Sequence, residues 1–283
     1  MRQTDGKKTS KPARSIQENL LFCWVFEQED VFREIIEAAW SIKVQDLEVV
    51  VQEKVYKTPD GTKGIRMDVW GRGKAVQWDV EMQRKELVDF DARLGFYHTR
   101  MQGGAIDAGE EYSELGDTYV LVFCDFDPYG FGDPVYNWLT VLDNHRDYSI
   151  DDRRHTMLVN MKAWRQMPEG QIREFAQYAE EDEVTGQLSS KIDSYVQRFR
   201  KHPTERMAEE AVMLASSFQF MLDEEREASR AEGEACGRDE MAAVAKALLR
   251  AERFEDLRAL SELQGRELGD AVSRYAEELG LRG

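Results

Sequence analysis

The chain has 283 residues and a formal net charge of −17, and this length suits one sizeable domain with an appendage or two small domains. Its 42% hydrophobic and 33% charged residues are typical of a soluble globular protein, and no apolar run approaches the roughly 20 residues of a membrane-spanning helix. The acidity argues against nucleic-acid binding driven by the field of the whole molecule, because Lys and Arg contacts to phosphate dominate such binding. Nucleic-acid binding through a local groove, or through a metal ion that neutralises carboxylates, is still compatible with this net charge.

The spacing of cysteine and histidine bears on compartment and on zinc. Cys23, Cys124 and Cys236 are far apart and lack CxxC spacing, which favours a reducing cytoplasm over a disulfide framework. The four histidines form no ligand pair at helical or strand spacing, so a zinc enzyme is not expected. The first 15 residues contain no apolar segment like that of a secretory signal and are typical of a disordered basic tail.

The first hundred residues predict helices followed by three strands. Apolar residues at helical spacing over residues 17–40 predict one or two amphipathic helices. The segments LEVVVQEKVY, GIRMDVW and AVQWDVEMQ, separated by the turns TPDG and GRGK, predict three consecutive antiparallel strands. A helix is then expected from about residue 89 to residue 108, with Asp89 or Asp91 at its N-cap.

Further strands and a long helical segment complete the chain. TYVLVFCDF, PVYNWLTVL and RRHTMLVNM predict strands, and the Ala-, Glu- and Leu-rich sequence after about Pro168 predicts helices. We therefore expect an α+β fold with helices packed on a sheet. In this division residues 1–15 are the basic tail, residues 16–165 the main domain and residues 166–283 an acidic helical extension.

Two of the predicted strands carry polar residues on one face, because successive side chains of a strand alternate between its two faces. In GIRMDVW, this face holds Arg66, Asp68 and Trp70. In AVQWDVEMQ, it holds Gln77, Asp79, Glu81 and Gln83. More commonly, such a pattern is simply the solvated face of a hairpin.

The register of the two strands decides whether this face can carry chemistry. If Asp68 lies opposite Glu81, their carboxylates can hold one divalent cation such as Mg²⁺, which takes few carboxylates and keeps waters. The cation would lower the pKa of a bound water and stabilise the charge on a phosphodiester under attack. A tight turn at residues 71–74 would instead set Asp68 opposite Gln77, so the site is expected to need a longer loop or a bulge within residues 71–77.

Several ordered blocks of the sequence resemble one protein family. TKGIRMDVW, WDVEMQ and YSELGDTYVLVFCDFDPYGFGDPVY are similar to the conserved blocks of the recombination-promoting nuclease (Rpn) family, transposase-like members of the PD-(D/E)XK superfamily. ENLLFCWVF and ARLGFYHTRMQGGAIDAGEEY are similar to its flanking helices. The match runs in consistent order over residues 17–162, and the acidic tail resembles the variable C-terminus of the family.

The resemblance implies a restriction-endonuclease-like core, in which a mixed central sheet is flanked by helices, and a metal-dependent DNA endonuclease linked to recombination or transposition. Asp68 matches the metal-binding Asp of the motif and Glu81 the second metal-binding acid, with Mg²⁺ or Mn²⁺ as cofactor. Gln83 stands where the superfamily usually has a lysine, and an amide can orient water but supplies no cation. The positive charge that this lysine would supply must then come from the metal, or from Arg93 or Lys85. Glu18 in the first helix is a further candidate metal ligand.

Two functional hypotheses stay open. In the first, Asp68 and Glu81 bind metal, Gln83 orients the attacking water and Arg93 assists with phosphate. In the second, a catalytically idle nuclease fold acts as a protein-interaction module through its acidic helical tail. Gly95 favours the second, because the family commonly has an arginine two residues after the position matched by Arg93.

A third hypothesis, an unrelated α+β adaptor, is disfavoured by the number of ordered blocks. For an active nuclease the expected partner is DNA and no membrane is involved. Because cutting both strands of a duplex generally needs two sites, a homodimer is favoured, although no residue pattern identifies its interface.

Overall fold

The computed structural model describes residues 15–56, 65–103, 109, 111–201, 238–251, 253–261 and 265–281. The chain divides into two compact units, one containing residues up to 52 together with 68–197, the other containing residues 53–67 together with those from 198 onward. The predicted basic tail lies outside the described residues, apart from Ser15. Within the described residues, no helix is both long enough and apolar enough to cross a bilayer.

A mixed six-stranded sheet, in the order β1-β2-β3-β4-β8-β5, forms the framework of the fold. Its strands are β1 (Val49–Tyr56), β2 (Ile65–Arg72), β3 (Val76–Gln83), β4 (Asp117–Cys124), β5 (Val135–Asn137) and β8 (Arg154–Asn160). The β2–β3 and β5–β8 pairs are antiparallel, whereas β3, β4 and β8 run parallel to one another. The predicted α+β class is confirmed.

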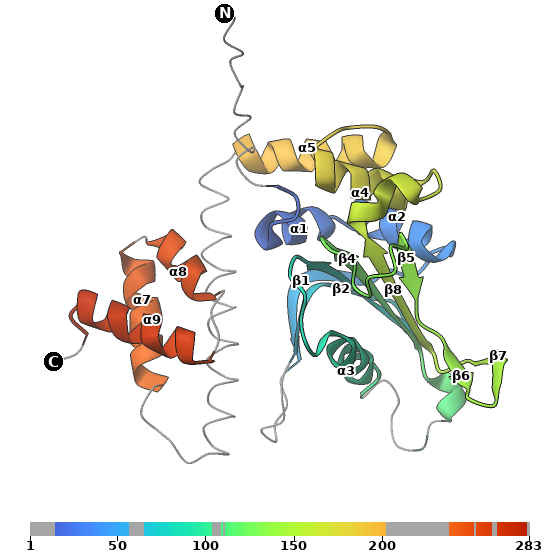
Figure 1. The fold of residues 1–283 in the computed structure, drawn as a ribbon, viewed down its shortest axis with the longest axis horizontal. Helices are drawn as coiled ribbons and strands as arrows, with labels where there is room; N and C mark the ends of the chain where they lie inside the picture. The colour runs from blue at the N-terminus through green and yellow to red at the C-terminus, as the bar shows by residue number, and fades with distance from the viewer. Residues whose placement is uncertain are drawn as a thin grey trace, which may run out of the picture. The chain divides into compact units, whose positions relative to one another are not determined.

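Helices cover both faces of this sheet (Figure 1). One face carries α1 (Asn19–Phe26), α2 (Glu29–Trp40), α4 (Gln171–Glu181) and α5 (Gln187–Lys201), and the other carries α3 (Phe90–Gln102). Phe26 and Phe123 both pack edge-on against Phe175, with ring centroids 5.1 and 4.4 Å apart, and so join α1, β4 and α4. Each buried phenylalanine contributes roughly 1.5–3 kcal/mol through the hydrophobic effect.

Helix α4 packs within the first unit. The boundary expected between residues 165 and 166 falls at the end of η2 (Met161–Gln166), and α4 packs on both η2 and α2 within the first unit. The second unit contains α7 (Arg238–Arg250), α8 (Phe254–Ser261) and α9 (Gly265–Glu278), which pack against one another. Every helix or strand described after Pro168 is thus a helix, as the composition of that segment predicted.

Helix α3 connects β3 to β4 and is fastened to the sheet by a buried histidine. Asp89 occupies its N-cap position, although its side chain makes no capping hydrogen bond. The His98 ring lies 2.7 Å from Thr118 Oγ1 on β4 and 2.7 Å from Thr156 Oγ1 on β8. Burial lowers the pKa of His98 to about 4, so its ring is neutral near pH 7. The helix ends at Gln102, and most of the segment up to residue 108, where its end was expected, lies outside the described residues.

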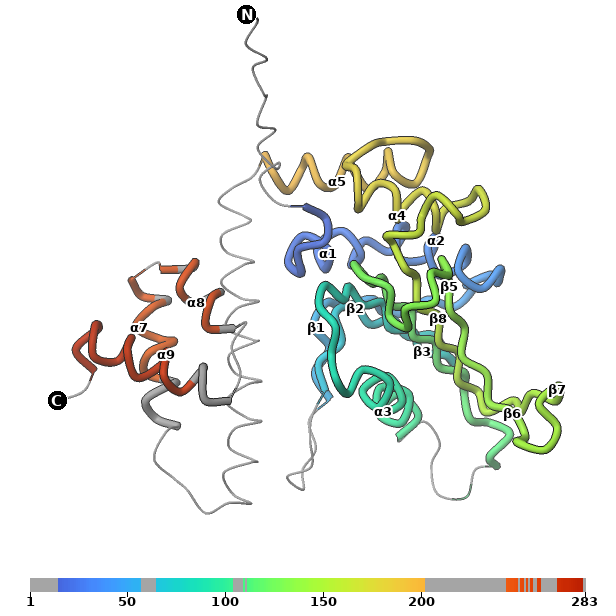
Figure 2. The backbone as a smooth tube through the Cα atoms, in the orientation of Figure 1, coloured from blue at the N-terminus to red at the C-terminus, as the bar shows by residue number. Residues whose placement is uncertain are grey.

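The expectation of one strand over PVYNWLTVL is wrong. The segment forms β5 in the main sheet and then β6 (Thr140–Leu142), which pairs with an unexpected strand, β7 (His145–Ile150). Every residue of β6 and β7 is exposed, and their hairpin protrudes from the end of the sheet (Figure 2). HRDYSI escaped detection because it is mostly polar and lacks the apolar alternation by which a half-buried strand is recognised.

Candidate functional site

Strands β2 and β3 have the register that brings the two matched acids together. Val69 pairs with Val80 in an antiparallel ladder, and continuing this register by one residue sets Asp68 across from Glu81. The alternative register, with Asp68 opposite Gln77, does not occur. No longer loop or bulge is needed, which corrects that expectation, because a tight turn simply comes two residues later than GRGK indicated.

The two glycines of the GRG segment explain the position of the turn. A Cβ at Gly71 would lie 2.5 Å from Cε1 of Phe32, so this glycine allows α2 to approach the strand and does not mark the turn. The turn follows at Gly73, whose N–H donates to the carbonyl of Val76 at 2.9 Å. A Cβ at Gly73 would in turn lie 2.5 Å from the carbonyl oxygen of Asp46. Both glycines are therefore required by close approach.

The carboxylates of Asp68 and Glu81 are each held by the backbone of the other strand. The Asp68 N–H donates to Glu81 Oε1 at 2.9 Å, and the Met82 N–H donates to Asp68 Oδ2 at 3.1 Å. The two residues are 9% and 4% exposed. Hydrogen bonds to charged groups are worth roughly 1.5–3 kcal/mol each. These two bonds therefore hold both carboxylates side by side, largely shielded from solvent.

Helix α3 places the positive charge of Arg93 next to this acidic face. Arg93 NH2 lies 3.8 Å from Glu81 Oε2, and its Nε donates to the hydroxyl of Tyr97 at 2.6 Å. Burial disfavours the charge of Arg93, but Tyr97, Glu81 and Asp68 outweigh this effect and raise its pKa. Burial and the charge of Glu81 raise the pKa of Tyr97 well above its usual value. The pair therefore consists of a cationic guanidinium and a neutral phenol.

A third carboxyl, that of Asp79, lies on the same face of β3 and was not selected from the sequence. Asp79 is fully buried, its carboxyl oxygens accept no hydrogen bond from a donor group of the described residues, and its carboxyl lies within hydrogen-bonding reach of that of Glu81. Burial, followed by the charges of Glu81 and Asp68, raises the pKa of Asp79 well above its usual value. Its spacing of two from Glu81 was visible in the sequence, but its complete burial was not.

The other residues singled out from the sequence lie at varying places. Gln83 ends β3 half-buried, and its Nε2 donates to the carbonyl of exposed Lys85 at 2.6 Å. Glu18 is the N-cap residue of α1. Among the described residues, no three His, Cys, Asp or Glu side chains are placed to share a metal ion, so Glu18 does not complete such a group with Asp68 and Glu81. Its role as a ligand stays a prediction.

The donor set nevertheless fits a hard divalent cation. Mg²⁺ is usually bound by one or two carboxylates and keeps several waters, and Asp68 and Glu81 supply two adjacent carboxylates. The buried carboxyl of Asp79 adds an oxygen acceptor beside them. The residues present therefore fit Mg²⁺ or Mn²⁺ far better than a thiolate or imidazole metal.

Asp127, by contrast, has a structural role. Its carboxylate accepts hydrogen bonds from the hydroxyl of Tyr136 at 2.7 Å and from the backbone N–H groups of Tyr129, Gly130 and Gly132 at 3.2, 2.9 and 2.6 Å. These bonds shape the loop that follows β4.

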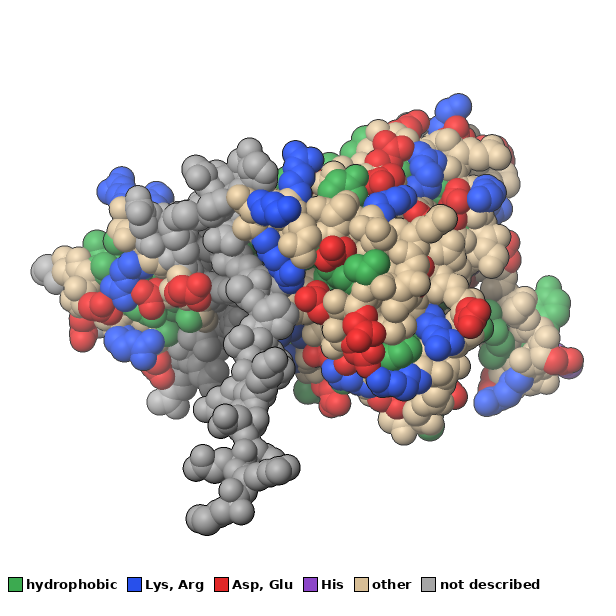
Figure 3. Space-filling model, turned by 90° about the horizontal axis from the view of Figure 1, so that it is seen from above, with side chains coloured by type: hydrophobic (Ala, Val, Ile, Leu, Met, Phe, Trp, Pro, Cys, Tyr) green, Lys and Arg blue, Asp and Glu red, His purple; other side chains and the backbone are tan. Residues whose placement is uncertain are grey.

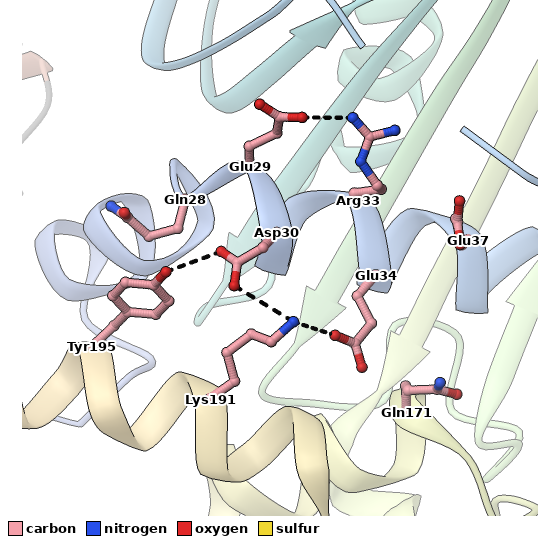
Figure 4. Close-up of a pocket in the computed structure, with 9 residues that line it drawn as sticks. All are labelled: Gln28, Glu29, Asp30, Arg33, Glu34, Glu37, Gln171, Lys191 and Tyr195. Carbon is pink, nitrogen blue, oxygen red and sulfur yellow. Dashed lines mark hydrogen bonds and ion pairs between the residues drawn. The ribbon is translucent and has the colours of Figure 1, made fainter. Parts of the chain in front are cut away.

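A hollow on the other face of the sheet is separate from this site (Figure 4). It lies between α2, α4 and α5, and both of the basic residues that line it are paired with acidic ones. Lys191 Nζ lies 2.6 Å from Glu34 and 3.5 Å from Asp30, and Arg33 lies 2.6 Å from Glu29. Seen from above, acidic and basic side chains are likewise interspersed over the larger unit (Figure 3). This hollow is a place where ion pairs join helices.

The mixed sheet, the helices on its two faces and the paired acids on adjacent strands define an α+β fold of the PD-(D/E)XK type. A family model described as PD-(D/E)XK nuclease family transposase matches residues 19–232, which is more than half of the chain. The chain belongs to this family, and the resemblance noted in its sequence is confirmed. Searches of curated proteins and of solved structures gave no significant match.

Proposed function

We propose that this protein is a metal-dependent DNA endonuclease that hydrolyses phosphodiester bonds in DNA recombination or transposition. The observation that carries the proposal is the register of β2 and β3, which sets Asp68 across from Glu81 with each carboxylate bonded to the opposite backbone. Membership of a nuclease family supports the same chemistry. In this proposal residues 16–165 hold the site and residues 166–283 form an acidic helical extension.

In the proposed mechanism, Asp68 and Glu81 hold Mg²⁺ or Mn²⁺. When bound there, the cation would lower the pKa of a water and would stabilise the negative charge of the phosphodiester. Gln83 orients the attacking water after its amide leaves the Lys85 carbonyl, and Arg93 neutralises part of the charge that develops on phosphate. Water attacks phosphorus in line with the leaving oxygen and loses a proton to solvent, while the bond from phosphorus to the leaving oxygen breaks and that oxygen takes up a proton from solvent.

The proposed substrate is DNA, and a net charge of −17 means that its affinity must come from local groups such as Arg93. Because cutting both strands of a duplex needs two sites, we propose a homodimer for double-strand cleavage. Cys23 and Cys124 are buried, and neither forms a disulfide within the described part of the chain, which supports a reducing cytoplasm as the working compartment.

Cleavage of supercoiled plasmid by the purified full chain tests the proposal. The reaction is run with Mg²⁺, Mn²⁺ or EDTA, with the wild type beside Asp68→Asn, which keeps the shape of the side chain and removes its charge. Asp143→Asn is the matched control, since the Asp143 side chain is 94% exposed on the β6–β7 hairpin. We expect metal-dependent nicking by the wild type and the control, and none by Asp68→Asn. Nicking of equal rate by all three proteins would refute the assignment.

The second candidate function is that of an idle nuclease fold acting as a protein-interaction module through its acidic helical tail. Two observations favour it, the net charge of −17 and the glycine at position 95. A Cβ at Gly95 would meet no atom within 4 Å, so the arginine common in the family can be restored by Gly95→Arg. Absence of cleavage by the wild type and by Gly95→Arg, together with no thermal stabilisation by metal, would establish the idle function.

A further inference from the structure

Asp79 presents a problem that the two metal-binding acids alone do not solve. Buried polar groups are nearly always hydrogen-bonded, and an exception calls for an explanation such as a functional role or a bound ion. Asp79 is 0% exposed, and among the described residues no N–H or O–H group donates a hydrogen bond to its carboxyl oxygens. An unsatisfied buried polar group costs roughly 1–3 kcal/mol, and more when it is charged, so the fold bears this cost at a position two residues from Glu81.

The surroundings of Asp79 show that it faces the candidate site. It pairs with Trp70 across β2 and β3, and strand alternation puts its side chain on the face of Glu81 and Asp68. The charges of Glu81, Asp68 and Arg93 all act on it. It is not a third direct ligand, because no three acidic side chains of the described residues converge as a metal group. Asp79 therefore faces the site but forms no three-residue metal-binding group with Asp68 and Glu81 in the described part of the chain.

We propose that Asp79 accepts a hydrogen bond from a water molecule bound to the divalent cation that Asp68 and Glu81 hold. This inference rests on the proposed metal site. Mg²⁺ keeps several of its waters when it binds protein, and those waters need acceptors. The Asp79 carboxyl, which is buried and receives no hydrogen bond from a donor of the described residues, provides such an acceptor.

Hydrogen bonds to the waters or ligands of a bound metal have a measurable effect on metal affinity. Residues that hydrogen-bond to the direct ligands or waters of a metal typically change metal affinity 10–100-fold when mutated. We therefore expect Asp79→Leu, which is close in shape and removes the acceptor, to weaken Mn²⁺ binding by about 10–100-fold. Asp79→Asn keeps one acceptor oxygen and loses the charge, so its effect should lie between those of wild type and Asp79→Leu.

The test is titration of the full-length protein with Mn²⁺, read by calorimetry and by the paramagnetic signal of free Mn²⁺, without DNA or turnover. Circular dichroism and tryptophan fluorescence check that each variant folds, and Asp79→Leu should fold at least as well as wild type because it removes an unsatisfied buried group. Glu81→Gln should abolish binding, and Asp143→Asn should leave it unchanged.

The outcomes separate this inference from the proposed function. Graded weakening in the order wild type, Asp79→Asn, Asp79→Leu supports it. Wild-type affinity in Asp79→Leu would overturn the inference and leave the proposed metal site standing. Complete loss in Asp79→Leu, as in Glu81→Gln, would overturn it in favour of a direct ligand. Failure of the wild type to bind Mn²⁺ would overturn the metal site itself and the inference with it.

Discussion

Acidification should loosen α3, the helix that carries Arg93 and Tyr97, because a neutral histidine fastens it to the sheet. His98 is 1% exposed and bridges Thr118 and Thr156 on two parallel strands. Its pKa is lowered from 6.5 to about 4 by burial. Below pH 6.5 the unfolded chain binds a proton at His98 that the folded chain binds only near pH 4. The stability due to the neutral ring is thus complete above pH 6.5 and is lost as the pH falls through about 4.

The size of this loss follows from the shift of the pKa. One pKa unit corresponds to about 1.4 kcal/mol, so a fall from 6.5 to about 4 costs about 3 kcal/mol of unfolding free energy by pH 4. Because domains are stable by only about 5–15 kcal/mol, a loss of this size should be readily measurable.

Urea denaturation at a series of pH values between 7 and 4 measures the effect. Tryptophan fluorescence reports the sheet unit, since all six tryptophans lie between residues 24 and 164. His98→Gln, which retains hydrogen-bonding groups and does not titrate in this range, is the reference. The free energy of wild type minus that of His98→Gln should fall by about 3 kcal/mol between pH 7 and pH 4. A difference that stays constant with pH would refute a buried, neutral His98.

Three substitutions test other parts of the fold and site. Gly95→Ala should raise the unfolding free energy by about 1 kcal/mol in a urea titration, because glycine inside a helix is unfavourable and the added Cβ meets nothing within 4 Å; a loss of stability would contradict this. Gly116→Ala should lower it by about 1–3 kcal/mol, because its Cβ would lie 2.4 Å from the carbonyl oxygen of Ala75, and an unchanged urea midpoint would argue against that close approach. Tyr97→Phe removes the hydroxyl 2.6 Å from Arg93 Nε and should slow single-turnover cleavage with circular dichroism unchanged, whereas an unchanged rate would show that Tyr97 does not position Arg93.

Most helices and strands could be predicted because their apolar residues follow the helical or strand period over long segments. The register of the site could not, since it depends on which glycine of GRG makes the turn. Gly71 is required by the ring of Phe32 from a helix about forty residues earlier, and such contacts are tertiary. A pattern of local residues cannot distinguish a glycine needed for packing from one needed for a turn.

The site itself was predictable in part. Asp68 and Glu81 were found through the resemblance to a nuclease family, whereas alternation alone pointed equally to a solvated face. Asp79 was not selected because its sequence spacing is that of any residue on the face. Its distinguishing property is complete burial with no N–H or O–H donor among the described residues, and this burial arises only when α3 covers the sheet.

The most direct test of the central claim is the rate of Mg²⁺-dependent plasmid nicking by Glu81→Gln relative to wild type. The substitution keeps the side-chain length and an oxygen acceptor for the Asp68 N–H, and removes the charge that would hold the cation. The account predicts that wild type nicks the plasmid and that EDTA abolishes this nicking. It also predicts that the variant, with unchanged circular dichroism, nicks at least about 100-fold more slowly. Equal rates for the two proteins, or nicking that survives EDTA, would contradict it.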